Sequence, residues 1–474
     1  MAEAASARWE PVIGLEIHVQ LRTRTKMFCG CALSFGDEPN VHTCPVCLGH
    51  PGTLPTANEQ AIHYALQIAA ALGCEVAPRS IFHRKNYFYP DLPKGYQISQ
   101  YDIPLASGGR LGDVRVHRVH LEEDAAKLTH VGESGRIHGS GASLVDFNRG
   151  GTPLVEIVTE PDLRDAAAAR EWAQLLRTTL RRLGVSDVNM EEGSLRVDAN
   201  VSVRPAGEEE LGTKAELKNM NSFRFLERGI NAEIARQVEL LEGGGKVEQE
   251  TLHFDPRSGA LTPLRSKEYA HDYRYFPEPD LVPLAPTAEM ISAATESLPE
   301  LPEARRERYR DELGLPEAAA IQLANDAAAG DYFERVLAHA EGVEAKVAAN
   351  WLTNELTAAV REAEDGSEPE PEVFARLVVM VATGKVSHAV GKQILGTIVA
   401  EGGDPEELAA GFESDTDIGE IVDRAIAAEP EAAEKVRAGE MRAIGPLVGA
   451  VMKETRGAAD GGEVTRLIRE KLGA

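Results

Sequence analysis

The sequence predicts an α+β fold in which an antiparallel sheet is followed by helical segments. At 474 residues the chain is long enough for two or three domains. With 43% hydrophobic and 27% charged residues, its composition is that of a soluble globular protein. From residue 12 to about 286, strand-like segments alternate with Gly, Pro and Asn turns. Beyond residue 302, Ala, Glu, Leu and Arg recur with helical periodicity.

The clearest strands alternate apolar and polar residues, and the clearest helices carry one apolar face. A period of two indicates antiparallel strands with one buried face and one wetted face. Strands are predicted over 13–21, 195–204 and 214–218. Helices that could cover this sheet are predicted over 58–72 and 164–183, and a third helix is predicted over 223–242. The last helix should end at Gly243-Gly244-Gly245, because glycine is a strong helix stop.

Two changes of texture predict where the domains divide. Prolines 286, 299 and 302 punctuate the first change, and a Gly-Gly-Asp-Pro segment at 402–405 marks the second. We therefore predict a catalytic domain over 1–295, a helical domain over 296–404 and a helical tail over 405–474. Residues 435–474 carry eight Lys or Arg against five Asp or Glu. This makes the tail a candidate RNA-binding patch, although on charge alone an ordinary solvated helix face is the simpler explanation.

The net charge of the chain bears on whether it binds nucleic acid, and its first residues bear on where in the cell it is found. The formal net charge of −26 argues against extensive phosphate contacts. Either the chain avoids nucleic acid, or it has an acidic surface with local basic patches. The first ten residues contain no apolar segment typical of a signal peptide, and no uninterrupted apolar stretch reaches membrane-spanning length. We expect a cytoplasmic protein with no membrane partner.

Four of the five cysteines lie in a short segment with the spacing of a metal site. The pairs are Cys29 with Cys31 and Cys44 with Cys47. Two close pairs in neighbouring turns can place four thiolates tetrahedrally around Zn²⁺, and such a closed site is structural. The loop 29–47 is therefore predicted to be held by zinc. Cys74 stands apart and is predicted to be a small core residue.

Acidic residues and one histidine indicate a second, catalytic metal site. Glu16 and His18 lie two apart on a predicted strand and so share its polar face. Further acids occur in the segment 122–124 and at Glu156. Carboxylates and an imidazole on one sheet face can hold Mg²⁺ that bridges nucleotide phosphates. Each acid taken alone is more often solvated or ion-paired, so the prediction depends on the set.

A basic and aromatic segment, Arg84-Lys85-Asn86-Tyr87-Phe88-Tyr89, could neutralise phosphate charge. Its aromatic residues could equally be core that covers the sheet. No P-loop occurs, because Gly243-Gly244-Gly245-Lys246 lacks the first Gly and the final Ser or Thr. An ATP site would therefore need a sheet cradle with metal-bound phosphates. No amidase nucleophile pattern is visible, so ammonia would have to come from a partner.

Several segments of the chain resemble the GatB family. They are 12–21, 84–91, 95–100, 144–157, 190–200, 214–219, 272–280 and 445–449. The most specific is Leu144-Val-Asp-Phe-Asn-Arg-Gly-Gly-Thr-Pro-Leu-Val-Glu-Ile157. The resemblance extends over nearly the whole chain. It implies a cradle similar to the glutamine synthetase/guanido kinase fold, followed by a helical domain and a helical tail.

The resemblance also implies ligands, partners and site residues. It implies a heterotrimer with an amidase subunit, GatA, and a small subunit, GatC. The Mg²⁺ ligands it implies are Glu16, His18, Glu123 and Glu156, and it places Lys85 and Asp198 near the reacting groups. The nucleotide-binding residues expected from the matched segments are Lys85, Arg149, Lys214 and Glu216. The zinc site matches one branch of the family.

The function expected from the resemblance is ATP-dependent amidation of misacylated tRNA, either Glu-tRNA(Gln) or Asp-tRNA(Asn) or both. The side-chain carboxylate would be phosphorylated, and ammonia from the glutaminase subunit would then replace phosphate. One alternative is a non-catalytic, zinc-stapled RNA-binding scaffold subunit. Another is a free-standing ligase that acts on a small amino acid. The acidic and histidine set on one strand face favours the enzyme over the scaffold.

Overall fold

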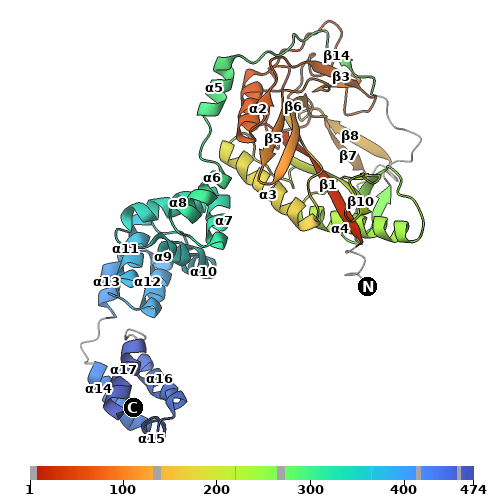
Figure 1. The fold of residues 1–474 in the computed structure, drawn as a ribbon. Helices are drawn as coiled ribbons and strands as arrows, with labels where there is room; N and C mark the ends of the chain where they lie inside the picture. The colour runs from red at the N-terminus through yellow and green to blue at the C-terminus, as the bar shows by residue number, and fades with distance from the viewer. Residues whose placement is uncertain are drawn as a thin grey trace. The chain divides into compact units, whose positions relative to one another are not determined.

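The computed structural model describes residues 8–131, 140–218, 220–263, 273–363, 366–412, 418–455, 459 and 461–473. The chain forms two compact units, Met1–Pro302 and Glu303–Ala474 (Figure 1). Asn219 and Asp272, which belong to two of the family-like segments, lie outside the described residues. Within the described part of the chain, no helix is long and apolar enough to cross a membrane.

A nine-stranded sheet forms the centre of the first unit, in the order β13-β12-β11-β10-β1-β9-β6-β5-β2. The strands are β1 (Trp9–Gln20), β2 (Glu75–Val76), β5 (Ala106–Leu111), β6 (Val114–Glu123), β9 (Pro153–Thr159), β10 (Leu195–Pro205), β11 (Ala215–Lys218), β12 (Thr251–Phe254) and β13 (Leu261–Pro263). Every pair of neighbours is antiparallel except β11 and β12, which are parallel. The sheet is therefore mixed rather than purely antiparallel. The exception arises because a whole helix, α4 (Phe223–Glu242), connects β11 to β12, which gives the long crossover that parallel strands need.

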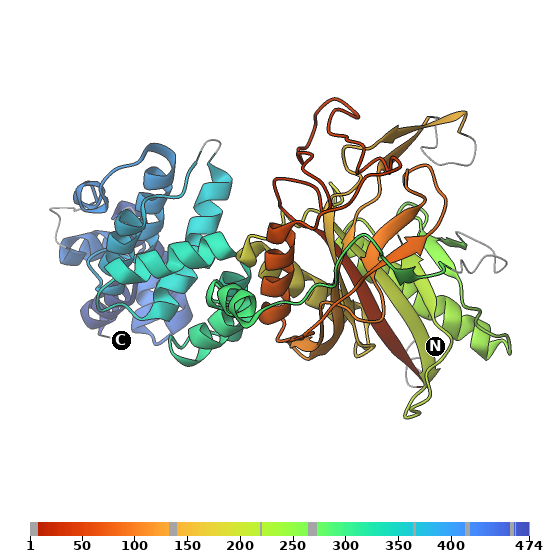
Figure 2. The same cartoon turned by 90° about the horizontal axis from the view of Figure 1, so that it is seen from above.

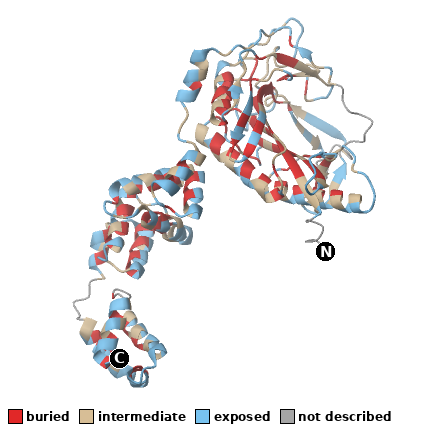
Figure 3. Cartoon of the chain, in the orientation of Figure 1, coloured by how far each residue is buried: buried red, intermediate tan, exposed pale blue. Residues whose placement is uncertain are grey.

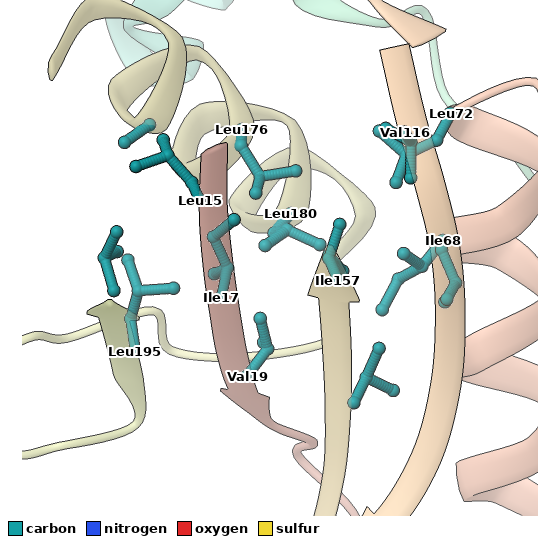
Figure 4. Close-up of a cluster of buried hydrophobic side chains, with 14 of the residues drawn as sticks. Leu15, Ile17, Val19, Ile68, Leu72, Val116, Ile157, Leu176, Leu180 and Leu195 are labelled. Atoms are coloured by element: carbon teal, nitrogen blue, oxygen red, sulfur yellow. The ribbon is translucent and has the colours of Figure 1, made fainter. Parts of the chain in front are cut away.

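One face of the sheet is the hydrophobic core of this unit. The apolar residues of β1, Ile13, Leu15, Ile17 and Val19, are at most 1% exposed. Figure 4 shows three of them beside Leu176 and Leu180 of α3 (Ala166–Leu183). Ile68 of α2 (Glu59–Ala71) belongs to the same cluster, and Figure 2 shows this helix against the sheet from a second direction.

Local signals explain where the three covering helices begin and end. Asn58, Asp165 and Ser222 each accept a hydrogen bond from a backbone N–H of the first helical turn of α2, α3 and α4. The last of these helices is capped by Gly243, as predicted. The three predicted helices and the three predicted strands are confirmed, with ends shifted by at most four residues.

Two small sheets flank the main one. The first contains β14 (Phe276–Pro277), β3 (Phe82–Asn86) and β4 (Tyr96–Gln100), and the second contains β7 (Lys127–Val131) and β8 (Ala142–Asp146). β5 pairs with β6 only as far as Val119, so the end of β6 has a free edge. β4 uses side chains to occupy that edge: Gln100 accepts from Leu121 N–H at 3.1 Å, and Gln97 donates to the Glu123 carbonyl at 2.8 Å. This contact fastens the smaller sheet that carries β3 to the end of β6.

The second unit is helical and has two separate hydrophobic cores, and Figure 3 shows the buried residues on the inner sides of its helices. One core contains residues between Tyr309 and Ala409, and the other contains residues between Ile421 and Leu472. The helices of the first are α6 (Pro302–Asp311), α7 (Glu317–Asn325), α8 (Ala327–His339), α9 (Ala345–Asn350), a π-helical turn (Trp351–Leu356), α10 (Thr357–Glu362), α11 (Pro371–Ala382), α12 (His388–Glu401) and α13 (Pro405–Ala410). Those of the second are α14 (Ile418–Ala428), α15 (Pro430–Arg437), a 3₁₀ turn (Met441–Ala443), α16 (Ile444–Glu454) and α17 (Gly461–Leu472). The predicted domain bounds at 295 and 404 stay predictions.

The close contact between α2 and β5 gives a test of this packing. A Cβ added to Gly109 of β5 would lie 2.3 Å from Cys74 Sγ and 2.4 Å from the Leu72 carbonyl oxygen. Replacing Gly109 with Ala should therefore destabilise the protein by about 1–3 kcal/mol, because these neighbours must move. The midpoint of urea unfolding measures this. Gly141→Ala is the matched control, since a Cβ there meets no atom within 4 Å; equal midpoints for the two variants would contradict this packing.

Candidate functional site

The face of the sheet opposite the core collects charged side chains from four neighbouring strands. Residues that face one another across antiparallel strands point to the same side of the sheet. His18 of β1 is opposite Arg196 of β10 on one side and Glu156 of β9 on the other. His120 of β6 is opposite Glu156 in turn. The register thus places these four residues in one row across the sheet.

The structure brings His18, Glu122 and Glu156 together in what we call the acid cluster. Each offers one ligand atom, and these atoms lie within 4.8 Å of one another. His18 Nε2 is 3.6 Å from a Glu122 oxygen and 3.9 Å from a Glu156 oxygen. Both glutamates are buried, whereas the His18 side chain is 21% exposed. Two carboxylates and an imidazole form a donor set that fits Mg²⁺ or Mn²⁺.

A buried histidine beside the acid cluster keeps its carboxylates charged and oriented. His120 Nε2 lies 2.8 Å from Glu156 and 3.7 Å from Glu122. Burial lowers the pKa of His120, but the two glutamates outweigh burial and raise it to about 9. Burial alone would raise the pKa of Glu156, yet the charge of His120 holds it well below its usual range. The Ser99 hydroxyl donates to Glu122 at 3.0 Å, so both acids are also fixed in direction.

Two cations flank the acid cluster. The Lys85 ammonium, on β3, lies 4.8 Å from the centre of the Tyr273 ring. Burial lowers the pKa of Lys85, but the charge of Glu122 and neighbouring groups outweighs it and leaves the pKa raised. On the other side, Arg196 Nη2 is 3.0 Å from the buried carboxylate of Asp124. A charged phosphoryl group at the acid cluster would therefore meet positive charge from two directions.

Glu16 and Asp198 lie in the next row of the sheet, directly opposite each other. Asn200 donates to Glu16 at 2.8 Å, and Lys218 donates to Asp198 at 3.1 Å. The same lysine lies 2.8 Å from Glu216 of β11. Glu16 shares its face with His18 but is not among the three residues of the acid cluster. This second row is an ion-pair network next to the acid cluster.

Glu123 lies on the other side of β6 from the acid cluster. Its carboxylate accepts from Ile98 N–H at 3.0 Å and forms a close ion pair with Lys94. Its neighbour Glu122 lies beside His18, whereas the resemblance implied Glu123 as a ligand. The reason is strand geometry, because adjacent residues of a strand point to opposite faces.

The two remaining predicted nucleotide-binding residues lie in different surroundings. The Arg149 guanidinium donates to the carbonyls of Ala125 and Ala126 at 3.0 and 2.8 Å, so it braces the chain after β6. Lys214 is exposed and directly precedes β11. Arg149 and Lys214 are therefore not part of the acid cluster.

The four predicted cysteines also come together. The Sγ atoms of Cys29, Cys31, Cys44 and Cys47 lie within 4.8 Å of one another. A hydrogen bond with Cys29 and the charge of Lys26 outweigh burial and lower the pKa of Cys47 to about 4. Lys26 is 1% exposed and donates to the Phe147 carbonyl at 2.9 Å. Four convergent thiols, of which Cys47 has a lowered pKa and Cys29 and Cys31 have raised ones, are a donor set that fits a structural zinc site.

Comparison with known proteins assigns the family. A model of the GatB/GatE catalytic domain matches residues 11–292, which is more than half of the chain. The chain belongs to the GatB/GatE family. A second model, described as the GatB domain, matches residues 331–472. The membership predicted from the sequence is confirmed, and the first model's description makes the sheet unit a catalytic domain.

Curated GatB relatives match this chain from end to end. A protein from Moorella thermoacetica is 50% identical over 98% of this chain and 100% of its own length. One from Frankia casuarinae is 49% identical over 98% and 96%, and one from Thermobifida fusca is 47% identical over 98% and 94%. All three are named as the B subunit of an aspartyl/glutamyl-tRNA(Asn/Gln) amidotransferase.

His120 and Arg196 of this GatB-family site were missed by the sequence prediction, and Glu122 was noted only as one of the acids of the segment 122–124. The sequence does contain a signal for two of them. From Arg118 onward the alternating pattern Arg-Val-His-Leu-Glu puts His120 and Glu122 on one face of a strand. Arg196 had a weaker signal, its place on the polar side of the predicted strand 195–204. Its importance depends on its partner Asp124, 72 residues away in sequence.

The buried carboxylate of Asp124 gives a test of the electrostatics beneath the site. It accepts from Gln20 at 2.6 Å and pairs with Arg196. Burial raises its pKa, but Arg196 and Arg149 outweigh burial and lower it. Asp124→Asn should destabilise the protein by about 1–3 kcal/mol at pH 7, a range discounted because Arg196 is partly exposed.

The pH dependence of this effect follows from the direction of the shift. A carboxyl with a lowered folded-state pKa stabilises the protein above its unfolded-state pKa of about 3.9, and that stability is lost as the pH falls. The difference between Asp124→Asn and the wild type in urea unfolding should therefore shrink below about pH 4. Asp113→Asn, at an exposed turn, is the control and should change little. A difference that stays constant with pH would show that the Asp124 charge is not the cause.

Proposed function

We propose that this chain is the ATP-using B subunit of a tRNA-dependent amidotransferase, which amidates Glu-tRNA(Gln), Asp-tRNA(Asn) or both. The observation that supports this most is the acid cluster of His18, Glu122 and Glu156, flanked by Lys85 and Arg196. Family membership and the names of its relatives agree with this activity. The sheet unit would then act as the cradle of a glutamine synthetase/guanido kinase-like fold.

In the first step the side-chain carboxylate of the aminoacyl group attacks the γ-phosphorus of ATP, and ADP leaves. His18, Glu122 and Glu156 would hold Mg²⁺, which would supply charge neutralisation for the phosphates. Lys85 and Arg196 would bind the phosphoryl oxygens from opposite sides and so orient the phosphoryl group. Glu16, one row away, would add a carboxylate to the side of the metal, and Asp198 would lie close to the reacting groups. Catalysis of this kind consists mainly of positioning and charge neutralisation.

In the second step ammonia attacks the acyl carbon, phosphate leaves, and the nitrogen loses one proton to give the amide. The site must exclude water, because water would hydrolyse the acyl phosphate. The sequence contains no recognisable amidase nucleophile pattern. We therefore propose that ammonia comes from a glutaminase partner, GatA, in a heterotrimer that also contains GatC.

Other parts of the chain have supporting roles in this proposal. The cysteine cluster would hold a structural Zn²⁺, and the C-terminal helices would grip the tRNA body by shape and backbone contacts. The protein would work in the cytoplasm. A non-catalytic RNA scaffold is the rival, but it gives no reason for the acid cluster. ATP hydrolysis that is stimulated by misacylated tRNA separates the two.

Replacing Glu156 with Gln tests the assigned chemistry. The neutral amide cannot balance a divalent cation, so amidation should fall at least 100-fold, as should that of Glu16→Gln. The glutaminase activity of the partner subunit should remain measurable, which shows that the complex still assembles. Full amidation by either variant would refute the assigned roles. Glu160→Gln, just beyond the end of β9, is the matched control.

Metal binding distinguishes Glu122 from Glu123. Binding of Mn²⁺, followed by its paramagnetic resonance signal, should weaken in Glu122→Gln and persist in Glu123→Gln. This result is expected because Glu123 is engaged by Ile98 and Lys94 on the opposite side of β6. The reverse pattern would restore the ligand set predicted from the sequence.

The cysteine cluster is tested by metal analysis. The purified protein should contain about one zinc per chain, as four-thiolate sites do. Cys47→Ser should lose most of this zinc and unfold at a lower temperature, because zinc binding is coupled to folding of the loop. Cys74→Ser is the control, since this thiol lies outside the cluster. Zinc content that is unchanged in Cys47→Ser would exclude the site.

A further inference from the structure

Four tyrosines form a row of ring-to-ring contacts beside the acid cluster. We call Tyr87, Tyr273, Tyr275 and Tyr101 the tyrosine row. Ring centroids are 6.3 Å apart between the first two, 6.0 Å between the next two and 4.2 Å between Tyr275 and Tyr101. The residues come from three separate places: after β3, before β14 and after β4. The fold therefore builds this row from distant segments.

One part of the row adjoins the catalytic groups. The Lys85 ammonium lies 4.8 Å from the centre of the Tyr273 ring. Burial raises the pKa of Tyr87 and of Tyr275, and the charge of Glu122 raises both further. The geometric link is Lys85, which contacts the Tyr273 ring and flanks the acid cluster. A molecule lying along the row would therefore have one end at the acid cluster.

The other end of the row is open to solvent. Tyr101, at this end, is 57% exposed. Its ring stacks on Tyr275 with an interplanar angle of only 9°, and His83 touches it at an angle of 75°. The ring is thus held in a fixed orientation while much of it stays accessible. A rigid, exposed aromatic surface of this kind suits a flat ligand.

We propose that Tyr101 and Tyr275 form a stacking platform for a purine base, the one at the unpaired 3′ end of the aminoacyl-tRNA. The proposal rests on the function proposed above and names where that substrate's end lies. Unpaired RNA is recognised largely by stacking of its bases on aromatic side chains. A base on Tyr101 would let the attached aminoacyl group extend along the row to Lys85 and the acid cluster.

The charge of the chain favours stacking over phosphate contacts. With a net charge of −26, the protein as a whole repels RNA. Stacking energy does not depend on phosphate neutralisation, so it can hold the substrate end where few cations are available. Lys85 and Arg84 are the nearest cations on β3, but Arg84 is occupied by Glu278 at 2.7 Å. The adenine of ATP has the same ring chemistry, so the test must separate the two sources.

The experiment uses the assembled complex with its partner subunits. One probe is misacylated tRNA with 2-aminopurine in place of its 3′-terminal adenine, and the other is 2-aminopurine riboside triphosphate in place of ATP. 2-Aminopurine fluorescence is quenched when the base stacks. The tRNA probe should be quenched by the wild type and by Tyr101→Phe, which keeps the ring, and not by Tyr101→Leu. The KM for tRNA should rise about 5- to 100-fold in Tyr101→Leu, while the KM for ATP stays unchanged.

Each other outcome overturns the proposal in a recognisable way. Quenching of the tRNA probe that survives in Tyr101→Leu, with an unchanged KM, would show that the platform does not hold this base. A loss confined to the triphosphate probe would assign the platform to ATP instead. Failure of the wild-type complex to amidate tRNA would refute the proposed function itself. Phe35→Leu, an exposed aromatic residue on the cysteine loop, controls for loss of surface aromatic area, because Phe35 is 83% exposed.

Discussion

The pairing register of β1 with β9 and β10 is the constraint on which the site depends. Ile17 and His18 are neighbours, yet one is fully buried in the core and the other belongs to the acid cluster. A slip of one residue would exchange these faces. It would bury an imidazole among aliphatic side chains and separate it from Glu156. The hydrophobic core therefore fixes the chemistry, because burial of one face leaves a single register for the other.

A fold that gathers carboxylates must also offset their repulsion. Glu122 and Glu156 are buried side by side, where their charges would otherwise favour protonation of one. His120, on the same strand as Glu122 and opposite Glu156, supplies the compensating charge from within. This arrangement keeps both acids ionised, and leaves His18, the more exposed member, to face the ligand. The acids are thus ready to bind a cation without first losing a proton.

The sequence predicted those parts of the structure that local periodicity determines. β1 and β10 were predicted from an apolar residue at every second position, and the three covering helices from a helical repeat of 3.6 residues. The four cysteines predicted to form a metal site do lie close together. The choice between Glu122 and Glu123 could not be read from the acidic triplet, because adjacent acids give no phase. In the structure the phase follows from the register of β6 with β9, which puts His120 opposite Glu156 and so turns Glu122 to the same face. The parallel pairing of β11 with β12 likewise depends on how α4 packs, which no local pattern records.

Backbone hydrogen bonds connect the cysteine loop to the strand that carries Glu122, although the two sites have separate chemistry. Met27 N–H donates to the Gly151 carbonyl at 2.7 Å, and Gly151 N–H donates to the Asp124 carbonyl at 2.8 Å. Gly151 has a φ of +87°, and a side chain there would press against Lys26. The turn between β8 and β9 is thus clasped between the loop and the end of β6. A zinc ion in the loop would stiffen this turn and, through it, the strand that carries Glu122, without touching the substrate.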